Sequence, residues 1–220
     1  MTKSFWAILA VIAVVLGGIF VVSSKNNDTG PTASASAVTK HITGSGSTGI
    51  TLQEYGDYQC PICGTFYPVV KQVEAKYKDQ IYFQFSNLPL TSLHPNAFAA
   101  ARAAEAAGMQ DKYFEMNDVL YQNQQTWSSA SSAETIFTSY AQQLGLNSAK
   151  FKQDFASTKV NTAINADVAA FKKTGNDQAT PTFFLDGKKL NNTDLFDSKN
   201  QPSLEKFSAL IDAAIAKKKQ

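Results

Sequence analysis

The sequence predicts an α/β domain that contains an inserted α-helical subdomain and follows a transmembrane helix at the amino terminus. Strand-like and helix-like patterns alternate over residues 49–86, in the order strand, helix, strand. Strand patterns return only after residue 180, and residues 93–174 show helical patterns throughout. These two observations predict one α/β domain that is interrupted by a block of helices.

The amino-terminal segment is an uncharged apolar run from Phe5 to Val22. As a helix it would span about 27 Å, close to the roughly 30 Å of hydrocarbon in a bilayer. A cleavable signal peptide is the alternative, but its apolar core is usually about 7–15 residues long and is followed at once by a cleavage site. Here the small-residue triplets lie only at 33–37. We therefore expect residues 1–22 to be an uncleaved signal anchor of a single-pass protein in the cell membrane.

The residues around the apolar run predict an extracytoplasmic domain on a flexible linker. Lys3 and the amino terminus precede the apolar run, which favours a cytoplasmic amino terminus and an extracytoplasmic domain. Residues 23–48 are rich in Ser, Thr, Gly, Ala and Asn, with almost no large apolar side chains. This composition is typical of a flexible linker. The folded domain is then expected over residues 49–220.

The first strand, predicted over 49–55, leads to Cys60-Pro61-Ile62-Cys63, which contains the only two cysteines of the chain. Apolar residues then recur at helical spacing. Pro61 suits the first helical position, so Cys60 is predicted to be the N-cap. Unpaired backbone N–H groups and the helix dipole would favour its thiolate, the reactive form of cysteine. Cys63, one turn further along, is expected to be more buried and less reactive.

Three other interpretations of the cysteine pair are disfavoured. A disulfide ring this small would stabilise the fold by only about 2 kcal/mol, against roughly 3 for a fifteen-residue loop. Zinc needs four ligands, and His41 and His94 do not form a second ligand pair, so no metal is expected. Two inert core thiols are disfavoured by the position at a helix start. A redox pair is the favoured interpretation.

Glu54 is a candidate proton carrier for this pair. Ile50, Leu52 and Glu54 share one strand face, so Glu54 should point to the same interior as the two aliphatic side chains. Burial raises the pKa of a carboxyl group, which could then exchange protons with Cys63 through a water molecule near neutral pH. The alternative is a glutamate that faces water at the sheet edge. Asp57, on the following turn, is expected to be solvated or to cap backbone groups.

The rest of the chain supplies the insertion and the carboxyl-terminal elements. Residues 81–86 form a second strand pattern, which predicts a right-handed βαβ unit. His94 opens the insertion and is expected to be a structural hydrogen-bonding residue. Helices are predicted over 97–107, 109–123, 133–144, 148–157 and 160–173.

A strand predicted over 180–185 and a hairpin turn at Asp186-Gly187 precede a strand at 188–190, and an amphipathic helix over 203–217 closes the chain. Pro181, at the start of this strand, has no backbone N–H to donate to a neighbouring strand. A proline in this position is typical of a rigid turn, which is sometimes cis. The chain has a net charge of +2 and 44% apolar residues, which allows a real core and gives no sign of a nucleic-acid partner.

Residues 49–217 resemble the thioredoxin fold, and the insertion makes the chain similar to the DsbA-like branch, in its membrane-anchored or secreted members. The resemblance rests on the order of the elements and on three segments, Tyr55–Cys63, Leu90 with His94-Pro95, and Ala179–Phe184. It implies that Cys60 is the exposed nucleophile, Cys63 its buried partner and Glu54 the buried acid beneath them. Pro181 would be the cis-proline that faces the disulfide, and Thr180 would offer backbone groups to an extended substrate.

The activity implied by the resemblance is thiol–disulfide exchange without a cofactor. The protein would be a monomeric dithiol oxidase for unfolded or reduced exported proteins, and a separate membrane redox partner would reoxidise it. One departure concerns Ile62, where many strongly oxidising members of the branch have histidine, so a disulfide reductase or isomerase is the nearest alternative. A membrane-tethered binding or chaperone module, with incidental cysteines, is an alternative of another class.

Overall fold

The computed structural model describes residues 40–219. The expected transmembrane segment and residues 23–39 of the expected linker lie outside the described residues. Within residues 40–219, no helix combines the length and the apolar character that crossing a bilayer requires.

The centre of the domain is a five-stranded sheet with the strand order β1-β3-β2-β4-β5. β2 and β3 are parallel, and all other neighbouring strands are antiparallel. Because helix α2 (Pro61–Tyr77) joins the two parallel strands, the predicted βαβ unit and the α/β class are confirmed. The strands are β1 (His41–Thr43), β2 (Ile50–Gly56), β3 (Ile81–Asn87), β4 (Thr182–Leu185) and β5 (Lys188–Lys189).

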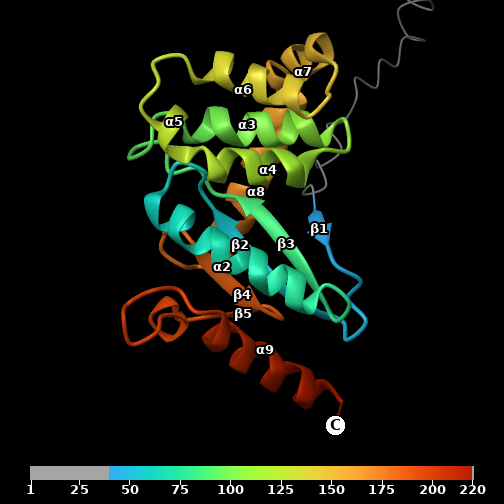
Figure 1. Ribbon diagram of the computed structural model, residues 1–220, viewed down its shortest axis with the longest axis vertical. Helices are drawn as coiled ribbons and strands as arrows, with labels where there is room; N and C mark the ends of the chain where they lie inside the picture. Colours follow the sequence, from blue (N-terminus) through green and yellow to red (C-terminus); the bar gives the residue numbers. More distant parts are fainter. Residues whose placement is uncertain (1–39, 220) are drawn as a thin grey trace, which may run out of the picture. The chain divides into compact units, whose positions relative to one another are not determined.

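Helices cover both faces of the sheet (Figure 1). On one face, α2 (Pro61–Tyr77) and α9 (Leu204–Lys218) pack together through aromatic rings. The Phe183 ring of β4 lies 5.4 Å from Phe66 of α2 and 5.2 Å from Phe207 of α9. On the other face, Tyr55 of β2 packs edge-on against Phe171 of the insertion. A 3-10 helix, η1 (Asn192–Leu195), precedes α9.

Residues 93–174 form the predicted helical insertion, and they contain no strand. Helix α3 lies in its middle, and its buried alanines leave room for neighbouring helices to approach closely (Figure 1). The helix expected over 109–123 is shorter and covers Tyr113–Gln122, because a turn with Asp111 at positive φ precedes it and Asn123 ends it. A separate short helix over Gln124–Ser128, which the sequence did not predict, follows it. The helices are α3 (Ala97–Gly108), α4 (Tyr113–Gln122), α5 (Gln124–Ser128), α6 (Ala133–Gln143), α7 (Ser148–Phe155) and α8 (Thr158–Lys173).

The amino-terminal boundary differs from the expected one. Residues 40–48 were predicted to belong to the linker, but His41 pairs with Phe85 and so adds β1 to the sheet. The His41 imidazole bonds Glu105 at 2.8 Å and stacks on the Tyr113 ring with the centroids 3.3 Å apart. A three-residue strand has no usable alternation of its own, and its order comes from partners that are distant in sequence. The folded domain therefore includes residues 40–48.

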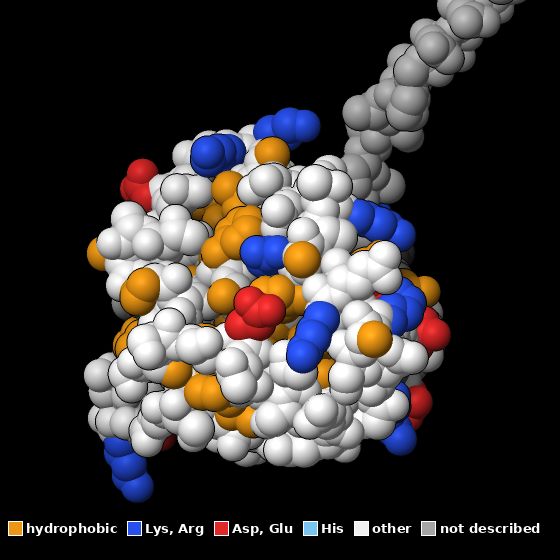
Figure 2. Space-filling model, turned by 90° about the horizontal axis from the view of Figure 1, so that it is seen from above, with side chains coloured by type: hydrophobic (Ala, Val, Ile, Leu, Met, Phe, Trp, Pro, Cys, Tyr) orange, Lys and Arg blue, Asp and Glu red, His pale blue; other side chains and the backbone are white. Residues whose placement is uncertain are grey.

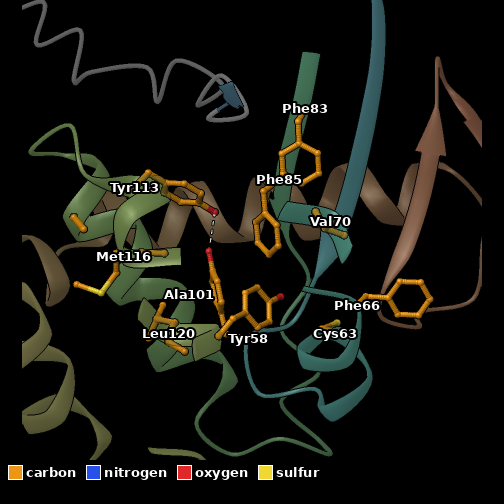
Figure 3. Close-up of a cluster of buried hydrophobic side chains, with 14 of the residues drawn as sticks. Tyr58, Cys63, Phe66, Val70, Phe83, Phe85, Ala101, Tyr113, Met116 and Leu120 are labelled. Atoms are coloured by element: carbon orange, nitrogen blue, oxygen red, sulfur yellow. Dashed lines mark hydrogen bonds between the residues drawn. The ribbon is translucent and has the colours of Figure 1, made fainter. Parts of the chain in front are cut away.

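The insertion joins the sheet through a buried aromatic cluster next to the cysteine motif. Tyr58, two residues before Cys60, stacks on Phe85 of β3. Figure 3 shows the hydroxyl groups of Tyr58 and Tyr113 pointing towards each other, and the Tyr58 hydroxyl donates to that of Tyr113 at 3.3 Å. Asn117 of α4 donates to the Tyr58 hydroxyl at 3.1 Å. The segment that enters the motif is thus anchored in the interface between sheet and insertion.

The outer face of the insertion carries charges of both signs. Figure 2 shows Lys and Arg side chains spread among Asp and Glu side chains over this face. Such a mixed distribution resembles an ordinary solvated surface rather than a concentrated basic patch.

Candidate active site

Cys60 occupies the predicted N-cap position of α2. Its backbone is extended, with φ −66° and ψ 120°, and Pro61 is the first helical residue. The Cys60 N–H donates to the Asp57 carbonyl at 3.1 Å, and the Cys60 carbonyl accepts from Gly64 N–H at 3.1 Å. Neither cysteine is bonded to another in this structure.

The exposure of Cys60 corrects one expectation. Cys60 was expected to be exposed, but the residue is only 6% exposed, whereas the neighbouring Ile62 is 51% exposed. The Cys60 sulfur lies against a loop from the other end of the chain, 3.4 Å from the Thr180 carbonyl oxygen. This loop covers the sulfur from a position 120 residues away, and therefore local sequence patterns did not reveal it.

The two sulfurs differ strongly in acidity. The hydrogen bond with the Cys63 thiol is the main cause that lowers the pKa of Cys60 to about 5, and backbone N–H groups of Cys63 and Ile62 add to it against the effect of burial. Cys63 is fully buried, and burial raises the pKa of its thiol well above the usual value. At neutral pH, Cys60 is therefore a thiolate and Cys63 a thiol. The helix terminus contributes as expected, but the partner cysteine contributes more.

Glu54 lies in the interior, as its strand pattern predicted. The residue is 4% exposed and sits between Phe85 of β3 and Phe183 of β4 in the sheet register. Burial, followed by repulsion from Glu74 and from Cys60, raises the pKa of Glu54 to about 8. A carboxyl group with this pKa holds its proton at neutral pH and can release it to a stronger base.

The Thr180–Pro181 peptide bond is cis, and β4 begins at the next residue. Pro181 is buried, and its carbonyl accepts a hydrogen bond from the Asn192 side chain at 2.7 Å. The structure thus brings Thr180 and Pro181 beside Cys60, although the two segments are far apart in the chain.

Asp57 is buried rather than solvated, which corrects one of the two expectations for it. Its carboxylate accepts from Gln59 N–H at 2.8 Å and from Leu90 N–H at 2.9 Å, and it bonds His94 Nδ1 at 2.7 Å. Asp57 therefore caps backbone groups, as the other expectation had it, and His94 is a hydrogen-bonding partner. Together they hold the loop before Cys60 against the loop after β3.

The sequence did not identify Gln124, which holds the cysteine motif through two hydrogen bonds. The Gln124 side chain of α5 donates to the Tyr58 carbonyl at 2.7 Å and to the Cys60 carbonyl at 2.9 Å. Gln124 is one amide in the stretch Gln122–Gln125, and neither periodicity nor a motif distinguishes it from its neighbours.

With this geometry established, comparisons with known proteins show the family and the fold. Residues 36–213 match the family model described as thioredoxin. The chain belongs to the thioredoxin family. Solved structures share its fold: α-DsbA1 from Wolbachia pipientis has a TM-score of 0.66 at 22% identity, covering 82% of this chain and 92% of that one. BdbD from Bacillus subtilis has a TM-score of 0.65 at 19% identity, covering 80% and 93%. The fold is thus that of the DsbA-like thiol–disulfide oxidoreductases.

Curated relatives match the domain as part of longer proteins. A Na(+)/H(+) antiporter, NhaA 1, from Mycobacterium sp. (strain KMS) is 35% identical over 153 residues, which is 68% of this chain and 24% of the antiporter. NhaA 1 from Salinispora arenicola is 32% identical over 176 residues, 80% of this chain and 25% of that protein. The chain spans about a quarter of the length of these relatives.

Proposed function

We propose that the protein is a thiol–disulfide oxidoreductase that acts as a dithiol oxidase and introduces disulfides into exported proteins. The observation that carries this proposal is the placement of the two cysteines at one helix start: Cys60 is the N-cap of α2 beside the Thr180 carbonyl, and Cys63 is fully buried in the first turn. This placement lowers the pKa of Cys60 and raises that of Cys63. A low pKa makes Cys60 a good leaving group and stabilises the reduced pair. Stabilisation of the reduced pair makes the disulfide form oxidising.

The first step is attack on the oxidised pair. A substrate thiolate attacks the Cys60 sulfur, the Cys60–Cys63 bond breaks, and its electron pair leaves on Cys63. Cys63, with its raised pKa, takes up a proton, which Glu54 supplies through an intervening water. The product is a mixed disulfide between Cys60 and the substrate.

The second step releases the product. A second substrate thiolate attacks the substrate sulfur of the mixed disulfide, and Cys60 leaves as a thiolate. The substrate loses two electrons and gains a disulfide, while the enzyme gains the two electrons as a dithiol. A membrane redox partner then removes these electrons and restores the Cys60–Cys63 disulfide. Only sulfur atoms are oxidised and reduced, so the exchange itself needs no organic cofactor or metal.

Substrate contacts are proposed at three positions around the sulfur. Backbone groups of Thr180 would pair with an extended substrate chain, which selects no particular side chains and suits unfolded proteins. Pro181 would face the disulfide and keep the substrate strand in place. Ile62, half-exposed beside the motif, would supply apolar contact.

The proposed setting is the extracytoplasmic side of the cell membrane. The apolar run from Phe5 to Val22 supports a single-pass anchor, and residues 23–39 would form a linker that lets a monomeric domain reach its substrates. The substrates would be unfolded or reduced exported proteins.

The test uses two cysteine variants. Cys63→Ala removes the group that can resolve the mixed disulfide from within the enzyme, so mixed disulfides with substrate should accumulate on non-reducing gels. Cys60→Ser should form none, because the nucleophile is lost. Equal accumulation in both variants would refute the assigned roles.

The same chemistry run in reverse, as a reductase or isomerase, is the second candidate. Ile62 favours it, because isoleucine provides the thiolate with neither charge nor hydrogen bond from its side chain. The equilibrium with glutathione separates the two directions, since about 30 mV corresponds to a tenfold change in the equilibrium constant. If the protein is instead a binding or chaperone module, the Cys60→Ser, Cys63→Ser double variant should keep full function.

A further inference from the structure

One side chain of the helical insertion, Gln124, forms hydrogen bonds with the active-site loop at Cys60 and at Tyr58 before it. The two hydrogen bonds from Gln124 Nε2 go to the carbonyls of Tyr58 and Cys60, at 2.7 and 2.9 Å. The Cys60 carbonyl is also the first acceptor of α2, because Gly64 N–H donates to it. One side-chain amide therefore bonds the peptide groups on both sides of the N-cap.

The first turn of α2 leaves room for this contact. A Cβ atom at Gly64 would lie 2.5 Å from Gln124 Oε1 and 3.1 Å from its Cδ, closer than non-bonded atoms approach. Glycine inside a helix is destabilising by roughly 0.5–1 kcal/mol relative to alanine. Glycine at position 64 therefore destabilises the helix, but it leaves the space that the Gln124 side chain occupies.

A second connection joins the same two segments without Gln124. Gln59 Nε2 donates to the Ser128 carbonyl at 2.7 Å, and Gln59 Oε1 accepts from Asn96 N–H at 2.6 Å. The Asn96 side chain in turn donates to the carbonyls of Ser128 and Ala130. This second connection should keep the insertion docked and folded when Gln124 is replaced.

We propose that Gln124 is a positioning residue for the redox pair, which holds the loop before α2 so that the Cys60 sulfur stays at the helix start and beside Thr180. Gln124 does not touch the sulfur, and it acts through the Tyr58 and Cys60 peptide groups. The inference rests on the proposed exchange function and adds that the insertion sets the reactivity of Cys60.

The experiment compares Gln124→Met, which keeps length without donors, with the matched control Gln125→Met at the exposed neighbouring position. The Cys60 thiolate is titrated by its absorbance at 240 nm in the reduced full-length protein. Gln124→Met should raise the pKa of Cys60 by roughly one unit. At pH values below this pKa, the fraction of Cys60 present as thiolate would then be about tenfold smaller. The equilibrium with glutathione should shift about tenfold towards the oxidised pair, about 30 mV. The control should change neither quantity.

Gly64→Ala provides an independent test through a double-mutant cycle. If the added methyl group acts by displacing Gln124, Gly64→Ala should raise the pKa of Cys60 by itself but not in the Gln124→Met background. An unchanged pKa in folded Gln124→Met, or equal effects of Gly64→Ala in both backgrounds, would overturn the proposal.

The titration does not depend on substrate turnover, so this inference and the proposed function can fail separately. A shifted Cys60 pKa in a protein without exchange activity would support the positioning role and refute the function. If Gln124→Met does not fold, Gln124→Glu replaces it, because a carboxylate keeps the size of the side chain and donates no hydrogen bond at neutral pH.

Discussion

Replacement of Glu54 by glutamine should make the protein more stable at neutral pH and slower in exchange. Glu54 has a pKa of about 8 in the folded protein against 4.5 for a free side chain. The folded state keeps the proton between these pH values, while the unfolded state loses it. The free energy of unfolding therefore falls as pH rises through this window, by 1.36 kcal/mol for each pH unit. The penalty reaches about 3 kcal/mol at pH 7 and about 5 kcal/mol above pH 8.

Glutamine does not titrate, so Glu54→Gln removes this penalty. The variant and the wild type should have similar stability at pH 4, where both side chains are neutral. At pH 7, the variant should be more stable by about 3 kcal/mol. The measurement is urea unfolding of the reduced proteins at both pH values.

A matched control is Glu134→Gln, which changes an exposed glutamate of α6. It should alter stability by no more than about 0.5 kcal/mol at either pH. If Glu54→Gln stabilises equally at pH 4 and pH 7, or does not stabilise at all, the buried protonated carboxyl group does not exist. Between about pH 6 and pH 9 the same variant should slow exchange, because Cys63 loses its proton donor; unchanged rates would reject the proton-transfer role alone.

Three further predictions concern the same loop. Absorbance at 240 nm should show the Cys60 thiolate of the reduced protein forming near pH 5. Cys63→Ala should raise the midpoint of this transition, because it removes the hydrogen bond that contributes most to the low pKa of Cys60. An unchanged midpoint would show that this hydrogen bond is not the main cause. Asp57→Ala removes the acceptor of the buried Gln59 N–H and the partner of the partly buried Leu90 N–H and His94 ring. It should lower the free energy of unfolding by about 2–4 kcal/mol in urea, whereas a loss below about 1 kcal/mol would show that water replaces the carboxylate. Ile62→His adds a hydrogen-bond donor beside the sulfur and should lower the pKa of Cys60 by less than about one unit, since the position is half-exposed; a raised pKa would refute this.

The fold was largely predictable because most of its elements have local signals. The apolar spacing after Cys60 predicted α2, and runs rich in β-branched, aromatic and other apolar residues predicted β2 and β3. β1 was missed because three residues cannot show a period. The partners that hold His41 are all distant in the chain; one of them, Glu105, lies 64 residues away.

The candidate site was predictable for the same local reason. The cysteine motif, Pro181 and the strand face of Glu54 are all visible as short patterns. The cover over Cys60 and the burial of Asp57 were not predictable, because Thr180 and His94 supply them from other parts of the chain. No sequence motif or periodicity distinguishes Gln124, because only folding brings it next to the Cys60 carbonyl.

An ionised Cys60 should make the pair oxidising, and the equilibrium of the protein with glutathione measures this property. The pKa of about 5 for Cys60 stabilises the dithiol form at neutral pH. We expect a reduction potential more positive than about −180 mV, towards the roughly −120 mV of strong oxidants. A potential at or below about −230 mV, within the range of glutaredoxins and thioredoxin, would contradict it.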